Sequence, residues 1–153
     1  IKATLEGARE LLEKFNSPAP PLRKGGEYDA MRHATRDTRL WCVFQPHQYH
    51  RTYDLFDKFV KAFGDADKII LLPIYSVAGR EDEEIKKKVS SEKLAESLVA
   101  NCKAQSGEDV IYLNNFDKAE AYLKKNIQPG DAGVIMGAGD IYKLTGRLLK
   151  KKI

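Results

Sequence analysis

The stretch RLWCVFQPHQYHRT, residues 39–52, joins a short apolar run to a cluster of polar, aromatic and cationic side chains. Its first part, residues 39–44, is apolar without alternation and contains aromatic and β-branched residues. An unbroken run of this kind is typical of a strand that is buried on both faces, as in a parallel sheet covered by helices. The stretch therefore predicts a central strand of an α/β domain, with polar groups directly behind it.

The same kind of apolar run recurs three times further along the chain. The three runs are KIILLPIY (68–75), DVIYL (109–113) and AGVIMG (132–137). Between the runs, and at both ends of the chain, apolar residues recur at helical spacing. The predicted helices span residues 1–15, 52–63, 90–104, 114–127 and 141–151. Ser90 or Ser91 is expected to cap the third of them, and Asn114 or Asn115 the fourth. Strands that alternate with helices favour a three-layer, Rossmann-like α/β domain with a mainly parallel sheet and helices on both faces.

Two segments interrupt this alternation. Residues 16–38 contain three prolines and a Gly-Gly pair, which forbid a continued helix, so we expect a surface insertion there. Residues 79–91, GREDEEIKKKVSS, form a charge run that we expect to be a solvated turn and an irregular lead-in to the next helix. Together with these two segments, the alternating strands and helices predict a single domain over residues 1–153. Because the chain starts inside a predicted helix and without Met, we expect a fragment of a longer protein.

Composition narrows the class of partner. Hydrophobic residues make up 42% of the 153 residues, enough for a core, and the net charge is +4. No apolar run approaches the roughly 20 residues that span a bilayer, and no basic stripe is interleaved with aromatic residues. We therefore expect neither a membrane nor a nucleic-acid partner. Cys42 and Cys102 have no metal-ligand spacing, which favours two buried, reduced thiols in a cytoplasmic protein.

The polar end of the opening stretch is the first candidate binding site. Ligands of parallel α/β sheets bind beyond the carboxyl ends of the strands. There we expect His47, Tyr49, His50 and Arg51 to project from a loop, with the Arg51 guanidinium suited to a carboxylate or phosphate. A solvated Arg51 and a His47 that is hydrogen-bonded within a turn are the alternatives. A metal site is not predicted, because the two histidines lack a third ligand.

The segments behind the first, second and fourth predicted strands, residues 45–52, 74–82 and 137–140, should open onto the same edge of the sheet. Thr52 is expected to cap the helix behind the first strand, where the helix N-terminus attracts negative charge. Gly137, Ala138 and Gly139 follow the fourth strand, and small residues let the backbone approach an anion or substrate closely. The alternative is that these glycines only permit a tight turn before a helix capped by Asp140. The chain contains neither a phosphate-binding P-loop nor a G-x-S-x-G nucleophile motif, so no catalytic set is complete.

The segment VFQPHQYHRT (43–52) resembles the F-Q-P-H-R-[YF]-[ST]-R-T motif of alanine-adding members of the Mur ligase family. Other landmarks of that family are similar and occur in the same order. They are IKATLEGAR (1–9), LFDKFVKAFGDADKIILLPIY (55–75), VSSEKLAESL (89–98) and GDAGVIMGAGDIYKL (130–144). The resemblance covers nearly the whole chain except residues 16–38.

This resemblance implies the C-terminal domain of a three-domain, ATP-dependent ligase of peptidoglycan synthesis in the bacterial cytoplasm. Such enzymes join L-alanine to UDP-N-acetylmuramate through an acyl phosphate. The N-terminal domain binds the UDP part, and the central domain carries the P-loop and binds ATP and Mg²⁺. The chain would then hold substrate-binding residues but no catalytic residue of its own, and the isolated fragment would be inactive.

By position in the motif, the resemblance implies that Arg51 binds the alanine carboxylate or a nearby developing anion. His47 would orient that group or hydrogen-bond the substrate, and Tyr49 keeps the aromatic position. Gln48 replaces the first arginine of the motif, so one positive charge is absent. His50 stands where Ser or Thr is usual, and its protonated form would supply part of the missing charge.

Two other functions are compatible with these residues. A related Mur ligase that reattaches recycled murein peptide would share the fold and much of the pattern. A stand-alone Rossmann-like binding module would instead use residues 137–139 for its ligand and would need no other domain.

Overall fold

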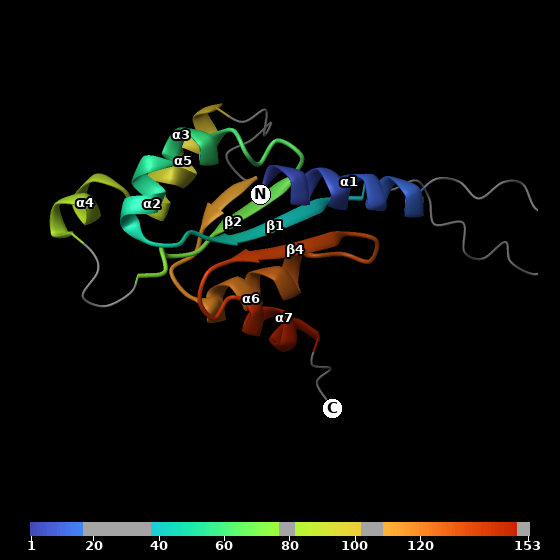
Figure 1. Cartoon of the computed structure of the whole chain (residues 1–153). Coiled ribbons are helices and arrows are strands. Elements are labelled where there is room, and N and C mark those ends of the chain that lie inside the picture. Colours follow the sequence, from blue (N-terminus) through green and yellow to red (C-terminus); the bar gives the residue numbers. More distant parts are fainter. Residues whose placement is uncertain (17–37, 77–81, 102–108, 150–153) are drawn as a thin grey trace, which may run out of the picture.

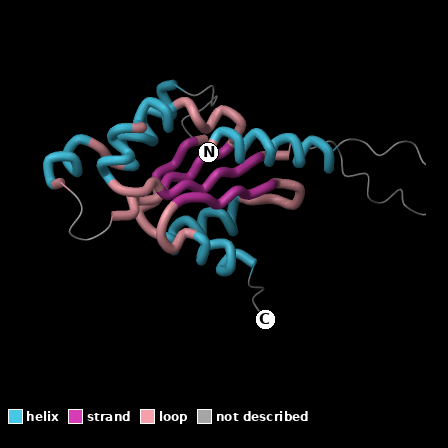
Figure 2. Tube along the Cα trace, viewed as in Figure 1, coloured by secondary structure: helices cyan, strands magenta, loops and turns pink. Residues whose placement is uncertain are grey.

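The computed structural model describes residues 1–16, 38–76, 82–101 and 109–149. Within them, four strands form one parallel sheet in the order β3-β2-β1-β4. The strands are β1 (Leu40–Gln45), β2 (Lys68–Leu71), β3 (Val110–Tyr112) and β4 (Ala132–Gly137). The predicted three-layer α/β architecture is confirmed, since helices lie on both sides of the sheet (Figures 1 and 2). Nearly all of the proposed insertion, and Cys102, fall outside the described residues.

The helices divide between the two faces of the sheet. In Figure 1, α1, α3 and α5 lie on one side and α6 and α7 on the other, while α2 and α4 extend past the end of the sheet. Their bounds are α1 (Lys2–Asn16), α2 (Tyr49–Asp54), α3 (Phe56–Val60), α4 (Glu83–Lys88), α5 (Ser91–Asn101), α6 (Phe116–Asn126) and α7 (Tyr142–Leu149). None of these helices has both the length and the apolar character needed to cross a bilayer.

Strand β1 is buried on both faces. Leu40, Cys42 and Phe44 belong to the core beneath α1, α3 and α5. Trp41 and Val43 belong to the core beneath α6 and α7. Because successive side chains of a strand point to opposite faces, a strand that lies between two helical layers needs an unbroken apolar run. Burial raises the pKa of the Cys42 thiol to about 12, which makes it an unreactive core group.

Several predicted element boundaries are confirmed by capping contacts. The main-chain N–H of Lys93 donates to Ser90 Oγ at 3.2 Å, so Ser90 caps α5. The N–H of Lys118 donates to Asn115 Oδ1 at 2.8 Å, so Asn115 caps α6. The predicted strand 68–75 is shorter in the structure, because β2 ends at Leu71 and Pro73 has no N–H for the ladder.

The prediction for the charge run was wrong where the structure describes it. Asp82 accepts a hydrogen bond from the N–H of Glu84 at 2.8 Å and caps helix α4 (Glu83–Lys88). Two pairs three residues apart, Lys86–Glu83 at 2.6 Å and Lys87–Glu84 at 2.7 Å, lie along this helix. Capping and side-chain pairing thus support a helix that has no apolar stripe to reveal it.

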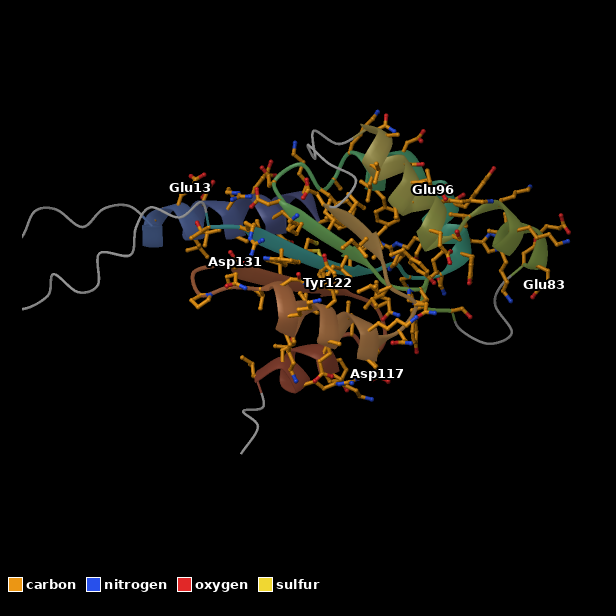
Figure 3. All side chains as sticks on the ribbon, turned by 180° about the vertical axis from the view of Figure 1, so that it is seen from behind. Glu13, Glu83, Glu96, Asp117, Tyr122 and Asp131 are labelled. Atoms are coloured by element: carbon orange, nitrogen blue, oxygen red, sulfur yellow. The ribbon has the colours of Figure 1, made fainter. Side chains whose placement is uncertain are left out.

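The amino ends of the strands are closed by a buried carboxylate. The side chain of Asp131 is 1% exposed and forms an ion pair with Arg39 at 2.7 Å. Trp41 Nε1 donates to it at 3.0 Å and the Gln128 N–H at 2.9 Å. Burial alone would raise the pKa of Asp131, but these hydrogen bonds outweigh burial and lower the pKa to about 2. In Figure 3, Asp131 and Glu83 lie at opposite ends of the molecule.

Candidate functional site

The strand order creates a switch point between β1 and β4. The chain runs from β1 outward to β2 and β3, then returns to place β4 on the other side of β1. Ligands of open α/β sheets bind at such a point, beyond the carboxyl ends of the strands. The segments 46–48 and 137–140 both begin there, because Gln45 pairs with Gly137 and the Ala138 N–H donates to Gln45 O at 3.2 Å. For these two of the three segments, the predicted common edge is confirmed.

A third segment joins them from the end of β2. His47 and Tyr75 form an isolated parallel bridge, and their rings stack with centroids 5.9 Å apart and planes 25° apart. Two main-chain hydrogen bonds of 2.8 Å, from Gln48 N to Tyr75 O and from Tyr75 N to Pro46 O, hold the segments together. The segment of Tyr75, residues 74–82, was expected at this edge, but Tyr75 itself was not singled out in the sequence. Its only signal was its place at the end of the apolar run 68–75.

The glycines after β4 fit closely against this edge. Gly139 has φ 64°, and a Cβ there would overlap the Tyr75 ring. Gly137 has φ 143°, and a Cβ there would overlap main-chain atoms of Gln45. The protein's own packing therefore requires both glycines, as the tight-turn alternative expected. Contact of Gly137, Ala138 and Gly139 with an anion or substrate stays a prediction.

The expected loop behind β1 is shorter than predicted. Helix α2 begins at Tyr49, so Tyr49, His50 and Arg51 project from a helix, and their expected placement on a loop was wrong. The predicted helix 52–63 is accordingly split, since α2 ends at Asp54 and α3 begins at Phe56. The apolar periodicity starts only at Leu55, so it could not reveal a first helical segment made of polar and aromatic residues.

Thr52 does not cap this helix, contrary to the prediction. It is completely buried inside α2, and its Oγ1 donates to Gln48 O at 2.7 Å. A threonine inside a helix bonds the carbonyl four residues earlier when its hydroxyl faces the helix, and this geometry excludes capping. The N-cap position belongs to Gln48, whose side chain makes no capping hydrogen bond.

Gln48 carries backbone strain at the centre of this edge. Its φ of 60° and ψ of 139° make it the one residue other than glycine with positive φ among those that the structure describes. Such a conformation costs about 1–3 kcal/mol and persists only where surrounding contacts hold it. Here Tyr75 O accepts from its N–H, and Thr52 bonds to its carbonyl through both N–H and Oγ1. Strain of this kind concentrates at binding and active sites.

The side chains of α2 differ in their surroundings. His50 and Arg51 are exposed, and within the described ranges Arg51 forms no ion pair or side-chain hydrogen bond. Its guanidinium is therefore available to an anion. Tyr49 is half-buried and lies near Tyr112 at the end of β3. Burial first, then the charge of Glu92 and a hydrogen bond to it, raises the pKa of Tyr112, with Tyr49 adding to the effect.

The described residues form no metal site. Over residues 1–16, 38–76, 82–101 and 109–149, no group of three His, Cys, Asp or Glu side chains is arranged to hold a metal ion. The edge thus combines stacked rings and close glycine backbone, and Arg51, exposed and without an ion pair among the described residues, follows it on α2. These groups suit a small substrate that carries a carboxylate or another anion.

A protein-family model described as "Mur ligase, glutamate ligase domain" matches residues 28–139. The chain belongs to the Mur ligase family. The resemblance seen in the sequence is thereby confirmed. The match ends at Gly139, so it includes β1, the strained segment behind it and the close glycines after β4. The switch-point edge is thus part of the Mur ligase domain.

Three curated relatives of this Mur ligase domain are each named UDP-N-acetylmuramate–L-alanine ligase. The protein of Acetivibrio thermocellus is 46% identical over 114 residues, which are 74% of this chain and 22% of the relative. That of Sulfurihydrogenibium sp. is 41% identical over 130 residues, 85% of this chain and 27% of the relative. That of Caldanaerobacter subterraneus is 33% identical over 154 residues, covering 99% of this chain and 30% of the relative. The chain therefore spans less than a third of the length of these relatives.

Proposed function

We propose that this Mur ligase domain is the C-terminal part of an ATP-dependent ligase that joins L-alanine to UDP-N-acetylmuramate in peptidoglycan precursor synthesis. The observation that carries the proposal is the match to relatives of that name, 46% identical in Acetivibrio thermocellus. The motif VFQPHQYHRT supports it, because residues 43–52 end at the switch point of the sheet, where a ligand would bind.

The proposed chemistry assigns a limited part to this chain. The muramoyl carboxylate is activated by ATP as an acyl phosphate, the alanine amine attacks the acyl carbon, and phosphate leaves as the amide forms. Arg51 binds the carboxylate of alanine through its guanidinium fork. His47, held in place by its stack with Tyr75, hydrogen-bonds the substrate and orients it. Gln48 and His50 flank this position and complete the substrate-facing set with Tyr49.

ATP and Mg²⁺ are assigned to another domain of the same protein. The chain has no P-loop motif, and the part that the structure describes offers no group of three ligands for a metal ion. The partners of the chain in this proposal are the N-terminal and central domains, with UDP-N-acetylmuramate, ATP and L-alanine as substrates. All three substrates are cytoplasmic metabolites in bacteria, which places the enzyme there.

The test is phosphate release by the full-length protein. With ATP, Mg²⁺, UDP-N-acetylmuramate and L-alanine present, release should require all three substrates and should yield UDP-N-acetylmuramoyl-L-alanine by mass. This chain alone should release no phosphate under the same conditions, because it lacks the P-loop.

Two outcomes would contradict the proposal. Release that depends on a murein tripeptide and not on alanine would instead indicate a ligase for recycled peptide. Release by the isolated chain, or a gene product without further domains, would favour a stand-alone module.

A further inference from the structure

Gln45, the last residue of β1, contacts all three segments that build the switch-point edge. Its Nε2 donates to Pro73 O at 3.0 Å, which ties down the segment leading to Tyr75. Its main-chain oxygen accepts from the Ala138 N–H at 3.2 Å, and it pairs with Gly137 in the ladder. Pro46 and His47 follow it directly in the chain. One residue thus links the ends of β1, β2 and β4.

The amide of Gln45 is unusual for a core position. The residue is 8% exposed, and its Oε1 is the one buried side-chain oxygen or nitrogen without a hydrogen-bond partner in the described part of the chain. An unpaired buried carbonyl lowers stability relative to an apolar side chain of the same length. The unpaired Oε1 thus offsets much of what the Nε2 bond to Pro73 O contributes, so the amide adds little net stability, which indicates that it serves the site.

We propose that Gln45 is a positioning residue of the site. Through its Nε2 bond to Pro73 it fixes the segment 73–75, so that the Tyr75 ring lies between His47 and Gly139. This arrangement holds the Tyr75 ring directly against the glycine backbone that follows β4. The assignment of that site to L-alanine rests on the proposed function. The positioning itself does not.

The first test uses this chain and its Gln45→Met variant. Because the Tyr75 ring lies directly against Gly139, the Gly139 Hα signals should show a ring-current shift in NMR spectra. Gln45→Met should remove most of that shift while the melting temperature changes by no more than about 3 °C. The matched control is Gln128→Met, the same change at the opposite end of the sheet, where the half-buried Gln128 precedes β4. It should leave the Gly139 signals in place.

The second test uses the full-length enzyme. Gln45→Met should raise the KM for L-alanine about tenfold and leave the KM for ATP unchanged. Gln45→Glu separates the hydrogen bond from side-chain shape, since only a protonated carboxyl can donate to Pro73 O. A buried carboxyl has a raised pKa, so Gln45→Glu should regain activity, relative to wild type, between about pH 8 and about pH 6. The other ionisable side chains on the same three segments are His47, Tyr75 and Asp140, so wild type is measured at each pH as the reference.

Each outcome is decisive. An unchanged Gly139 shift in Gln45→Met would overturn the proposal, as would a collapse of stability together with shifts throughout both cores, which would indicate a structural role. If the full-length enzyme shows no alanine-dependent phosphate release, the proposed function fails, and the NMR comparison still decides the positioning. If wild type is active and the alanine KM does not respond to Gln45→Met, the link between positioning and substrate fails alone.

Discussion

His47 and Tyr75 come from the ends of two different strands and meet as a stacked pair, with ring centroids 5.9 Å apart. The pair is held by main-chain hydrogen bonds on both sides and rests on Gly139, across the switch point. Because the bonds belong to the backbone, the two rings are placed before any substrate arrives. Preorganisation of this kind reduces the entropy lost when a small ligand binds.

Arg51 is expected to carry the carboxylate of the amino-acid substrate. In the full-length enzyme, Arg51→Ala should lower kcat/KM for L-alanine. The decrease should correspond to a loss of about 1.5–3 kcal/mol in transition-state stabilisation, the range for a lost charge-assisted hydrogen bond. Arg51→Lys should recover only part, because the bidentate fork is lost. Lys58→Ala, which removes another exposed cation in α3, is the control and should leave steady-state kinetics unchanged. Unchanged kinetics for Arg51→Ala would remove this residue from the site.

Substitution by alanine should strongly destabilise the protein at one glycine of strand β4 and have almost no effect at another. Gly137→Ala places a methyl group against main-chain atoms of Gln45 at φ 143°, so we expect a loss of about 3 kcal/mol in the free energy of unfolding. At Gly133 a Cβ would lie 3.8 Å from Ile127 Cδ1, an ordinary contact, so Gly133→Ala should stay within about 0.5 kcal/mol of wild type. Urea unfolding measures both, and similar values for the two variants would refute the close approach.

The hydroxyl of Thr52 should stabilise the strained turn at Gln48. Thr52→Val keeps the shape of the side chain but removes the 2.7 Å hydrogen bond to Gln48 O. The free energy of unfolding should fall by about 1 kcal/mol, as for a typical buried hydrogen bond. Thr52→Ser retains the hydroxyl and can keep this hydrogen bond, so its free energy of unfolding should fall less than that of Thr52→Val. The exposed Thr145 in α7 provides the control, and Thr145→Val should change stability little. Equal effects of the two valine substitutions would contradict the assignment.

Asp131 should make stability depend on pH in the acid range. Its pKa is about 2 in the folded protein against an ordinary 3.8, so its contribution is complete above 3.8 and is lost as the pH falls toward 2. The shift corresponds to about 2 kcal/mol. The free energy of unfolding of wild type should therefore fall more steeply between about pH 5 and about pH 2 than that of Asp131→Asn.

The comparison needs a second carboxylate, because other acidic groups also titrate in this range. Asp57 is exposed, and Asp57→Asn should follow the wild-type pH profile. The free energy of unfolding is measured by urea unfolding at each pH. If its pH profile is parallel for wild type and Asp131→Asn, the Arg39–Asp131 pair does not lower the pKa of the Asp131 carboxyl.

Much of the fold was predictable because burial leaves a local pattern. The unbroken apolar run of residues 39–44 predicted a strand covered on both faces, and β1 contributes to both cores. Helical spacing predicted the apolar sides of α1 and α6, and side-chain caps marked the start of α5 and α6. Pattern-based prediction failed for α2 and α4, which are short and polar and are held by capping or neighbouring contacts.

The site was predictable only in part. The sequence placed polar groups behind the first strand and glycines behind the fourth, since these positions follow from where each apolar run ends. It did not reveal Tyr75, the positive φ of Gln48 or the reach of the Gln45 amide to Pro73. Each of these depends on which strands are neighbours.

The sequence by itself thus determined the alternation of strands and helices, the two-faced burial of β1 and the family motif that ends at Arg51 and Thr52. Tertiary structure alone decided the order β3-β2-β1-β4, and with it the meeting of His47, Tyr75 and Gly139. The physical reason is the separation along the chain of the residues that interact. Periodicity records which side of one element is buried, whereas strand order and register are set by contacts between residues far apart in the chain, which no local pattern encodes.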